Sequence, residues 1–146
     1  MTLPDGYGYV PSSLITIGWV LVWQSIMVGR YRKRAGIEFP QLYAEKAEVK
    51  DSAAALRFNC MQRAHQNTLE TAPVVFVSTV MAGLKYPALA TAICVAYSFA
   101  RIAYTIGYKS GQPKRRVYGS IVSNFSVLGL LSTATYVAYQ LLPSCQ

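Results

Sequence analysis

The sequence predicts an all-α integral membrane protein built as a four-helix bundle. Of its 146 residues, 53% are hydrophobic and only 14% are charged. Four apolar stretches each approach the roughly 20 residues that a helix needs to cross a bilayer. Because a chain of this length has room for one domain, we expect a single four-transmembrane-helix domain over residues 1–146.

The expected helices are joined by connections of very different length. We place the helices at about residues 12–28, 56–84, 86–108 and 117–142. The long first connection, residues 35–55, mixes charges and is expected to cap the cytoplasmic side. Residues 85–87 form so short a connection that the helices on either side must run antiparallel. The third connection, residues 109–116, contains Gly111 and Pro113, which both break helices.

The charge pattern predicts the orientation in the membrane. The net charge is +8, from 14 Lys and Arg against 6 Asp and Glu, and the basic residues cluster in the first and third connections. The N-terminal segment instead carries Asp5. The positive-inside rule therefore puts both termini on the lumenal side. A nucleic-acid-binding protein would spread its basic residues over a surface, so we expect no nucleic acid partner.

The second helix carries a polar face inside an otherwise apolar protein. At about 100° per residue, Arg63, Asn67 and Glu70 lie within about 60° of one another, and Asn59 and Gln66 widen the arc to about 100°. Such groups are costly when they face lipid. They are therefore expected to line a cavity or an interface.

The third helix repeats this pattern. Four polar or aromatic residues fall within about 60° of one another: Tyr97, Arg101, Tyr104 and Tyr108. Glu70 is the only acid in any expected span, and it faces two arginines, Arg63 and Arg101. One Arg–Glu pair that ties two helices together is one interpretation, but it leaves an arginine, the amides and the tyrosines unexplained. Buried unpaired charge is expensive, which favours an anionic ligand.

The ligand should offer carboxylates to Arg63 or Arg101, an ammonium group to Glu70, and peptide groups to Asn67 and Gln66. Glutathione has all of these groups and a thiol. A charged peptide or a phosphorylated lipid would also use the arginines, so the residues alone leave the ligand open.

Residues 114–116, Lys-Arg-Arg, stand at the start of the fourth helix. Basic residues there serve either as a membrane anchor or as a group that stabilises a thiolate. A free cysteine thiol titrates near pH 8.5, and a neighbouring guanidinium favours its nucleophilic anion. Because arginine does not deprotonate, it acts only by stabilising charge or polarising the substrate.

His65 and the cysteines give weaker signals. His65 lies near 200° on the helix wheel, opposite the Arg63 face, and is either a packing residue or a contact to a neighbouring subunit's ligand. Cys60, Cys94 and Cys145 show no paired spacing, and with a single histidine they build no zinc motif. We expect no metal, and lipidation of Cys145 stays open.

Three motifs carry a resemblance to a known family. They are FNCMQRAHQNTLE at 58–70, RIAYTIGY at 101–108 followed by GQPKR at 111–115, and Arg32-Lys33 with Glu38-Phe39-Pro40. With these motifs the chain resembles the membrane-associated eicosanoid and glutathione metabolism (MAPEG) proteins over nearly its whole length. Within that family it is most similar to the type-3 microsomal glutathione transferases.

The resemblance implies a homotrimer in the endoplasmic reticulum (microsomal) membrane, with glutathione bound between subunits near the cytoplasmic face. One subunit would contribute five glutathione-binding residues: Arg63, Asn67, Glu70, Tyr104 and Tyr108. The neighbour would contribute Arg32, His65 and Arg115, with Arg115 beside the thiol as the catalytic residue and Arg116 as its alternative. Arg101 matches a family arginine with a structural or glutathione-linked role.

The activity implied is that of a glutathione transferase with glutathione-dependent peroxidase activity on lipid hydroperoxides. Glutathione would be the co-substrate, and a lipophilic electrophile would enter from the membrane lipid. Thr71 stands where leukotriene C4 synthases carry a tyrosine, which disfavours a dedicated leukotriene synthase. Alternatives are a glutathione-dependent eicosanoid synthase or isomerase (leukotriene C4 synthase-like or prostaglandin E synthase-like), a non-catalytic lipid-binding scaffold, and a small channel or transporter.

Overall fold

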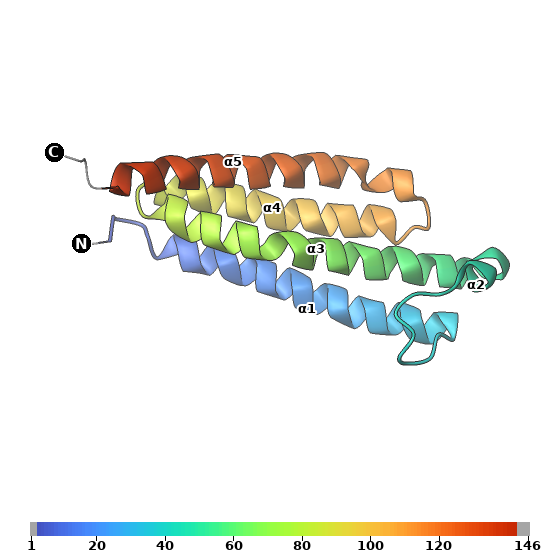
Figure 1. Cartoon of the computed structure of the whole chain (residues 1–146). Coiled ribbons are helices and arrows are strands. Elements are labelled where there is room, and N and C mark those ends of the chain that lie inside the picture. The colour runs from blue at the N-terminus through green and yellow to red at the C-terminus, as the bar shows by residue number, and fades with distance from the viewer. Residues whose placement is uncertain (1–2, 143–146) are drawn as a thin grey trace.

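The computed structural model describes residues 3–142, and every regular element in that range is helical. The elements are α1 (Tyr9–Ala35), α2 (Lys46–Asp51), α3 (Ala53–Gly83), α4 (Pro87–Tyr108), the 3-10 helix η1 (Pro113–Arg116) and α5 (Val117–Leu141). The long helices α1, α3, α4 and α5 run side by side, and α1 begins at the same end of the molecule where α5 finishes (Figure 1). The expected all-helical fold is confirmed.

Three of the long helices have the length and composition of membrane spans. They are α1, α4 and the segment Lys114–Leu141, which contains α5. The longest helix, α3 with 31 residues, is not among them, because its first half carries the polar face described above. These three helices fit an integral membrane protein, and the crossing of α3 stays a prediction.

The first helix is longer than expected. Its predicted range, 12–28, left out the basic run at 30–34, but α1 continues through this run to Ala35. Cations in the last turn of a helix interact favourably with its dipole, so the run extends α1 rather than ending it. Gly36 then ends the helix with φ +68°, and the N–H of Ile37 donates to the carbonyl of Arg32 at 3.3 Å. This left-handed cap is typical of glycine.

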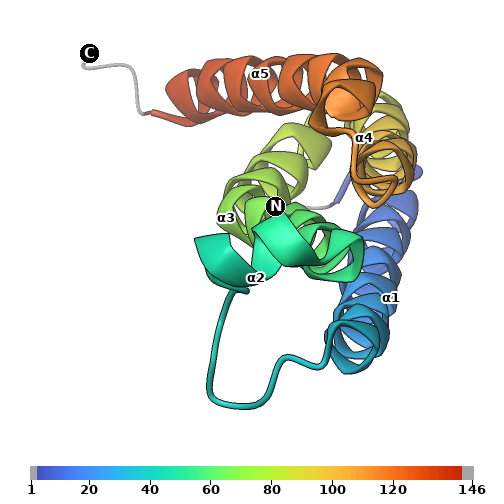
Figure 2. The same cartoon turned by 90° about the vertical axis from the view of Figure 1, so that its right-hand side faces the viewer.

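The helix of the long first connection, α2, packs against α3 (Figure 2). This helix begins with a capping box between Glu45 and Glu48. The amide of Asn59 on α3 accepts from the Ala44 N–H at 2.8 Å and donates to the Ala44 carbonyl at 2.9 Å. Phe58 is buried against Ile37 and its neighbours in a small apolar cluster. The connection is therefore fixed by both polar and apolar contacts.

The main apolar core occupies the half of the bundle farthest from this connection. It draws residues from all four long helices: Ile17, Ala72, Val75, Ala82, Ala90, Cys94, Tyr97 and Leu130. As expected, the turn at 84–86 brings α3 back as the antiparallel helix α4 (Figure 1). The polar residues of α3 and α4 consequently meet in the other half of the bundle.

Helices α4 and α5 approach each other closely at Gly119. A Cβ atom on Gly119 would lie 2.7 Å from the Ala100 carbonyl oxygen and also against the backbone nitrogen of Tyr104. Backbone atoms cannot move aside as a flexible side chain can. The position of α5 against α4, and with it that of η1, therefore depends on the absence of a side chain at 119.

We predict that Gly119→Ala lowers thermal stability, because the added methyl group forces α5 away from α4 at a cost of about 1–3 kcal/mol. Gly129→Ala is the matched control on the same helix, since a Cβ there would meet only the Ile93 Cδ1 atom at 3.7 Å. Thermal unfolding of both variants in detergent measures the difference. Equal midpoints for the two variants would contradict the close approach.

Candidate functional site

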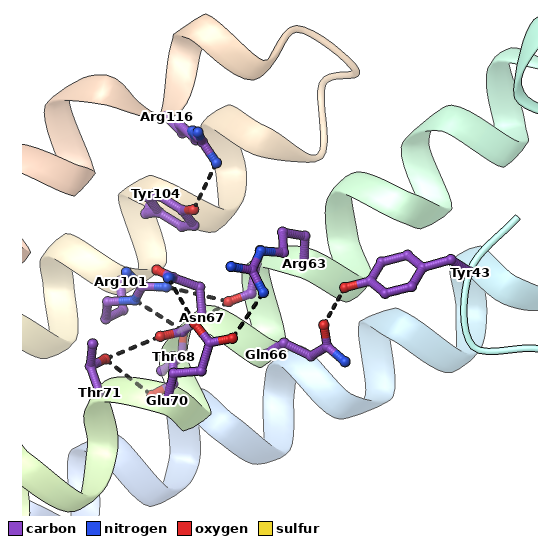
Figure 3. Close-up of polar contacts among 11 residues, drawn as sticks. Tyr43, Arg63, Gln66, Asn67, Thr68, Glu70, Thr71, Arg101, Tyr104 and Arg116 are labelled. Atoms are coloured by element: carbon purple, nitrogen blue, oxygen red, sulfur yellow. Dashed lines mark hydrogen bonds and ion pairs between the residues drawn. The ribbon is translucent and has the colours of Figure 1, made fainter. Parts of the chain in front are cut away.

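A buried polar layer crosses the middle of the bundle and joins three helices. Gln24 of α1 donates through Nε2 to the Thr68 hydroxyl at 2.9 Å and to the Thr105 hydroxyl at 2.7 Å. Arg101 of α4 donates through Nε to the same Thr68 oxygen at 3.0 Å and through Nη2 to the Ala64 carbonyl at 3.3 Å. Figure 3 shows Arg101 lying over Thr68 between α3 and α4.

Arg101 is 2% exposed, and its hydrogen-bond acceptors are neutral oxygens. Its guanidinium also stacks on the Tyr104 ring, 4.1 Å from the centroid. We expected Glu70 to face both Arg63 and Arg101. Within residues 3–142, the one ion pair joins Glu70 to Arg63. The hydrogen bonds of Arg101 therefore go to neutral groups of the polar layer and not to a carboxylate.

The predicted polar face of α3 is half exposed. The Arg63 Nη1 lies 2.8 Å from Glu70 Oε1, and the side chains of these two residues are 45% and 52% exposed. Asn67 donates to Glu70 Oε2 at 3.3 Å. Three of the predicted glutathione-binding residues are therefore in contact with one another and accessible from outside the chain (Figure 3).

The two other amides of this face have a different role. Gln66 accepts a hydrogen bond from the Tyr43 hydroxyl of the first connection, and Asn59 pairs with the backbone of Ala44. The five polar groups were expected to line a cavity or an interface, and Asn59 and Gln66 line the interface with the first connection. The first connection accounts for Asn59 and Gln66, because it supplies the partners that they would otherwise lack.

A second cluster joins η1 to the C-terminal end of α4. Arg116 donates through Nη1 to the Tyr104 hydroxyl at 3.3 Å, and its guanidinium lies 4.6 Å from the centre of the Tyr108 ring. The two tyrosine rings meet edge to face at 5.6 Å. Arg115 is exposed instead and lines a depression between α4 and α5 beside Tyr118. Within one chain, Arg116 contacts Tyr104 and Tyr108, and Arg115 does not.

Arg32 and His65, both expected at the neighbour's site, have different surroundings. Arg32 is buried and donates to the Gln41 carbonyl at 2.5 Å, and its guanidinium lies 4.5 Å and 4.6 Å from the rings of Phe39 and Phe58. These contacts make it an anchor of the first connection. His65 is half-buried, and its Nδ1 has no hydrogen-bond partner among the described residues.

Sequence reasoning missed Gln24, Thr68 and Thr105. An amide in the middle of the apolar first span was a visible signal, because a polar side chain there needs a partner on another helix. Nothing in the sequence names that partner. Thr71, noted for its departure from the synthases, bonds the Tyr97 hydroxyl at 2.5 Å.

The comparison with protein families decides the classification. A model described as the MAPEG family matches residues 11–136 of the chain, which include the polar layer and both clusters. The chain belongs to the MAPEG family. MAPEG proteins are in general glutathione-dependent enzymes, and they include glutathione transferases and eicosanoid synthases. The family resemblance is confirmed, while the likeness to the type-3 branch stays a prediction.

The MAPEG co-substrate, glutathione, suits the accessible groups chemically. The exposed guanidinium of Arg63 and carboxylate of Glu70 match a carboxylate and an ammonium group, and Arg116 offers a second cation. Within residues 3–142 no cluster of three or more His, Cys, Asp or Glu side chains could hold a metal ion. Cys145, considered for lipidation, lies outside the described residues.

We predict that Arg32→Ala loosens the first connection, because the guanidinium is clamped between two rings and bonded to the loop backbone. Limited proteolysis should cut residues 36–45 faster in this variant. Arg34→Ala, which removes an exposed arginine two residues on, is the control. A fall in glutathione affinity with unchanged proteolysis would instead make Arg32 a direct glutathione contact.

Proposed function

We propose that this MAPEG protein is a membrane glutathione transferase that also reduces lipid hydroperoxides. The proposal rests on one observation: the accessible residues Arg63, Asn67 and Glu70 lie on the same side of the bundle as Tyr104 and Arg116 (Figure 3). Tyr108 contacts both Tyr104 and Arg116. Together these residues present two cations, one anion and several hydrogen-bonding groups to a charged peptide. This inventory supports binding of glutathione by the residues named.

In this proposal the α3 residues bind glutathione, and the arginine of η1 stabilises its thiolate. Arg63 holds a carboxylate of glutathione, Glu70 holds its ammonium group, and Asn67 bonds a peptide group. Glutathione supplies a thiol, which is nucleophilic only as the thiolate. Arg116 stabilises that anion, because its guanidinium stays charged at every working pH.

For the thiolate we prefer Arg116 to Arg115, the residue that the resemblance expects from a neighbouring subunit. Arg116 contacts Tyr104 and Tyr108 of its own chain, whereas Arg115 faces away from them. We therefore take Arg116 as the thiolate-stabilising residue, with Arg115 of an adjacent subunit as the alternative. We assign no direct contact with glutathione to Arg101, because it is buried in the polar layer.

The exposure of the site supports an oligomer. A half-exposed ion pair in a membrane helix is costly against lipid, so another protein surface is expected to cover it. A homotrimer with glutathione between subunits meets this need, and His65 of the adjacent subunit then contacts the co-substrate. In this arrangement all four long helices cross the endoplasmic reticulum membrane and both termini are lumenal.

The acceptor is a lipophilic molecule that reaches the site from the bilayer. In the transferase reaction the glutathione sulfur bonds to an electrophilic carbon as a leaving group departs. In the peroxidase reaction a lipid hydroperoxide is reduced to an alcohol and water while two glutathione molecules become a disulfide. Accounting for consumed glutathione separates both reactions from an isomerase, which consumes none.

We predict that Arg116→Ala lowers the rate of conjugation to an electrophilic aromatic chloride by about a hundredfold, because the thiolate loses its counter-charge. Glutathione affinity, measured by calorimetry, should change little. Lys114→Ala, a neighbouring exposed cation, is the control and should keep the wild-type rate. If Arg115→Ala loses the rate and Arg116→Ala keeps it, the catalytic arginine comes from the other side of the subunit interface.

We predict that Glu70→Gln weakens glutathione binding about tenfold, because a neutral amide replaces the partner of the ammonium group. The rate at saturating glutathione should fall much less than the affinity. Calorimetric titration of the variant in detergent gives the dissociation constant. An unchanged constant would leave Glu70 as a purely structural partner of Arg63.

A further inference from the structure

Gln24 is a fully buried amide in the middle of α1 that the proposed site does not use. Its Nε2 bonds hydroxyl groups on two other helices, but its Oε1 has no hydrogen-bond partner among the described residues. An unsatisfied buried oxygen lowers stability and calls for an explanation. A leucine would fill similar space without this cost, so the amide is best explained by what its Nε2 holds.

Two threonines link Gln24 to Arg101, one to its side chain and the other to its backbone. The Thr68 hydroxyl accepts from Gln24 and from the Arg101 Nε, at 2.9 and 3.0 Å. The Thr105 hydroxyl accepts from Gln24 at 2.7 Å and donates to the Arg101 carbonyl at 2.7 Å. One amide of α1 thereby fixes the side chain and the backbone of the arginine on α4.

Arg101 in turn lies directly behind the cluster proposed to stabilise the thiolate. Its guanidinium stacks on the Tyr104 ring at 4.1 Å, and the hydroxyl of that tyrosine accepts from Arg116. The titratable side chains that act on Arg101 are Glu70 from α3 and Tyr97 and Tyr104 from α4. Arg116 of η1 lies 5.9 Å from the centre of the Tyr104 ring. Among these, Glu70 contacts Arg63, and α1 contributes only the neutral Gln24.

We propose that Gln24 is a positioning residue for the thiolate chemistry. Through Thr68 and Thr105 it fixes Arg101, whose charge acts from behind Tyr104 to stabilise an anion held at Arg116. In a protein interior a full charge acts over several ångströms, so Arg101 needs no contact with the co-substrate. This inference rests on the proposed function and adds to it a group on α1 and a buried cation.

The test replaces Gln24 by two side chains of similar size. Gln24→Glu places a carboxylate near Arg101, with only the Thr68 hydroxyl between them, and this negative charge offsets that of the arginine. Gln24→Met adds no charge. The readout is the ultraviolet absorbance of the glutathione thiolate bound to purified protein, followed against pH. We expect the midpoint of thiolate formation to rise by about one pH unit in Gln24→Glu and by less than about half of that in Gln24→Met. A folded Gln24→Glu protein with the wild-type midpoint would overturn the inference.

A second variant covers the case in which Gln24→Glu does not fold. Thr68→Val keeps the volume and removes the oxygen that Gln24 and Arg101 share. We expect kcat/KM at neutral pH to fall about fivefold and to recover toward the wild-type value at high pH, where glutathione ionises unaided. A merely structural role would lower the rate equally at every pH, and that result would contradict the inference.

The thiolate signal of the wild-type protein distinguishes a failure of this inference from a failure of the proposed function on which it rests. Absence of any thiolate signal from wild-type protein with glutathione contradicts the proposed function itself. A normal wild-type signal with unshifted midpoints in the folded variants contradicts only the role of Gln24. Helical content by circular dichroism establishes which variants are folded.

Discussion

The buried charge of Arg101 is the constraint on which the arrangement of the helices depends. A guanidinium in a bundle interior is tolerated only when fixed acceptors surround it. Here the acceptors are the Thr68 hydroxyl and the Ala64 carbonyl of α3, and Gln24 of α1 bonds the same hydroxyl. A rotation or shift of α1, α3 or α4 would break one of these bonds, so the layer sets the register of all three helices.

The polar layer also separates an apolar half of the bundle from a half that carries most of the polar residues. On one side, an apolar core that includes Val75 and Cys94 packs the helices together. On the other side, α3 is too polar to be a candidate membrane span. The first connection, which Asn59 and Arg32 hold in place, covers part of this half of α3. Arg63 and Glu70, both proposed to bind glutathione, stay exposed on this side. The fold thus decides which polar groups stay available.

Much of this was accessible from sequence because helical periodicity is a local property. The run around Arg63 gives the contacts among Arg63, Asn67 and Glu70 from residue spacing alone. The different surroundings of Arg115 and Arg116 within the chain were not accessible, because they depend on how η1 packs against the end of α4. The partners of Gln24 were not accessible either, since they lie 44 and 81 residues away along the chain.

Arg63 and Arg101 show why residue type alone does not assign a role. Arg63 is half exposed and paired with Glu70, so a ligand can exchange partners with it at small cost. Arg101 is buried with neutral acceptors, and displacing any of them would strand a charge in the interior. A binding role therefore suits Arg63, whereas the role proposed for Arg101 is to act on an anion through its electric field and through Tyr104. The difference lies in burial, which the fold sets and the helical wheel does not show.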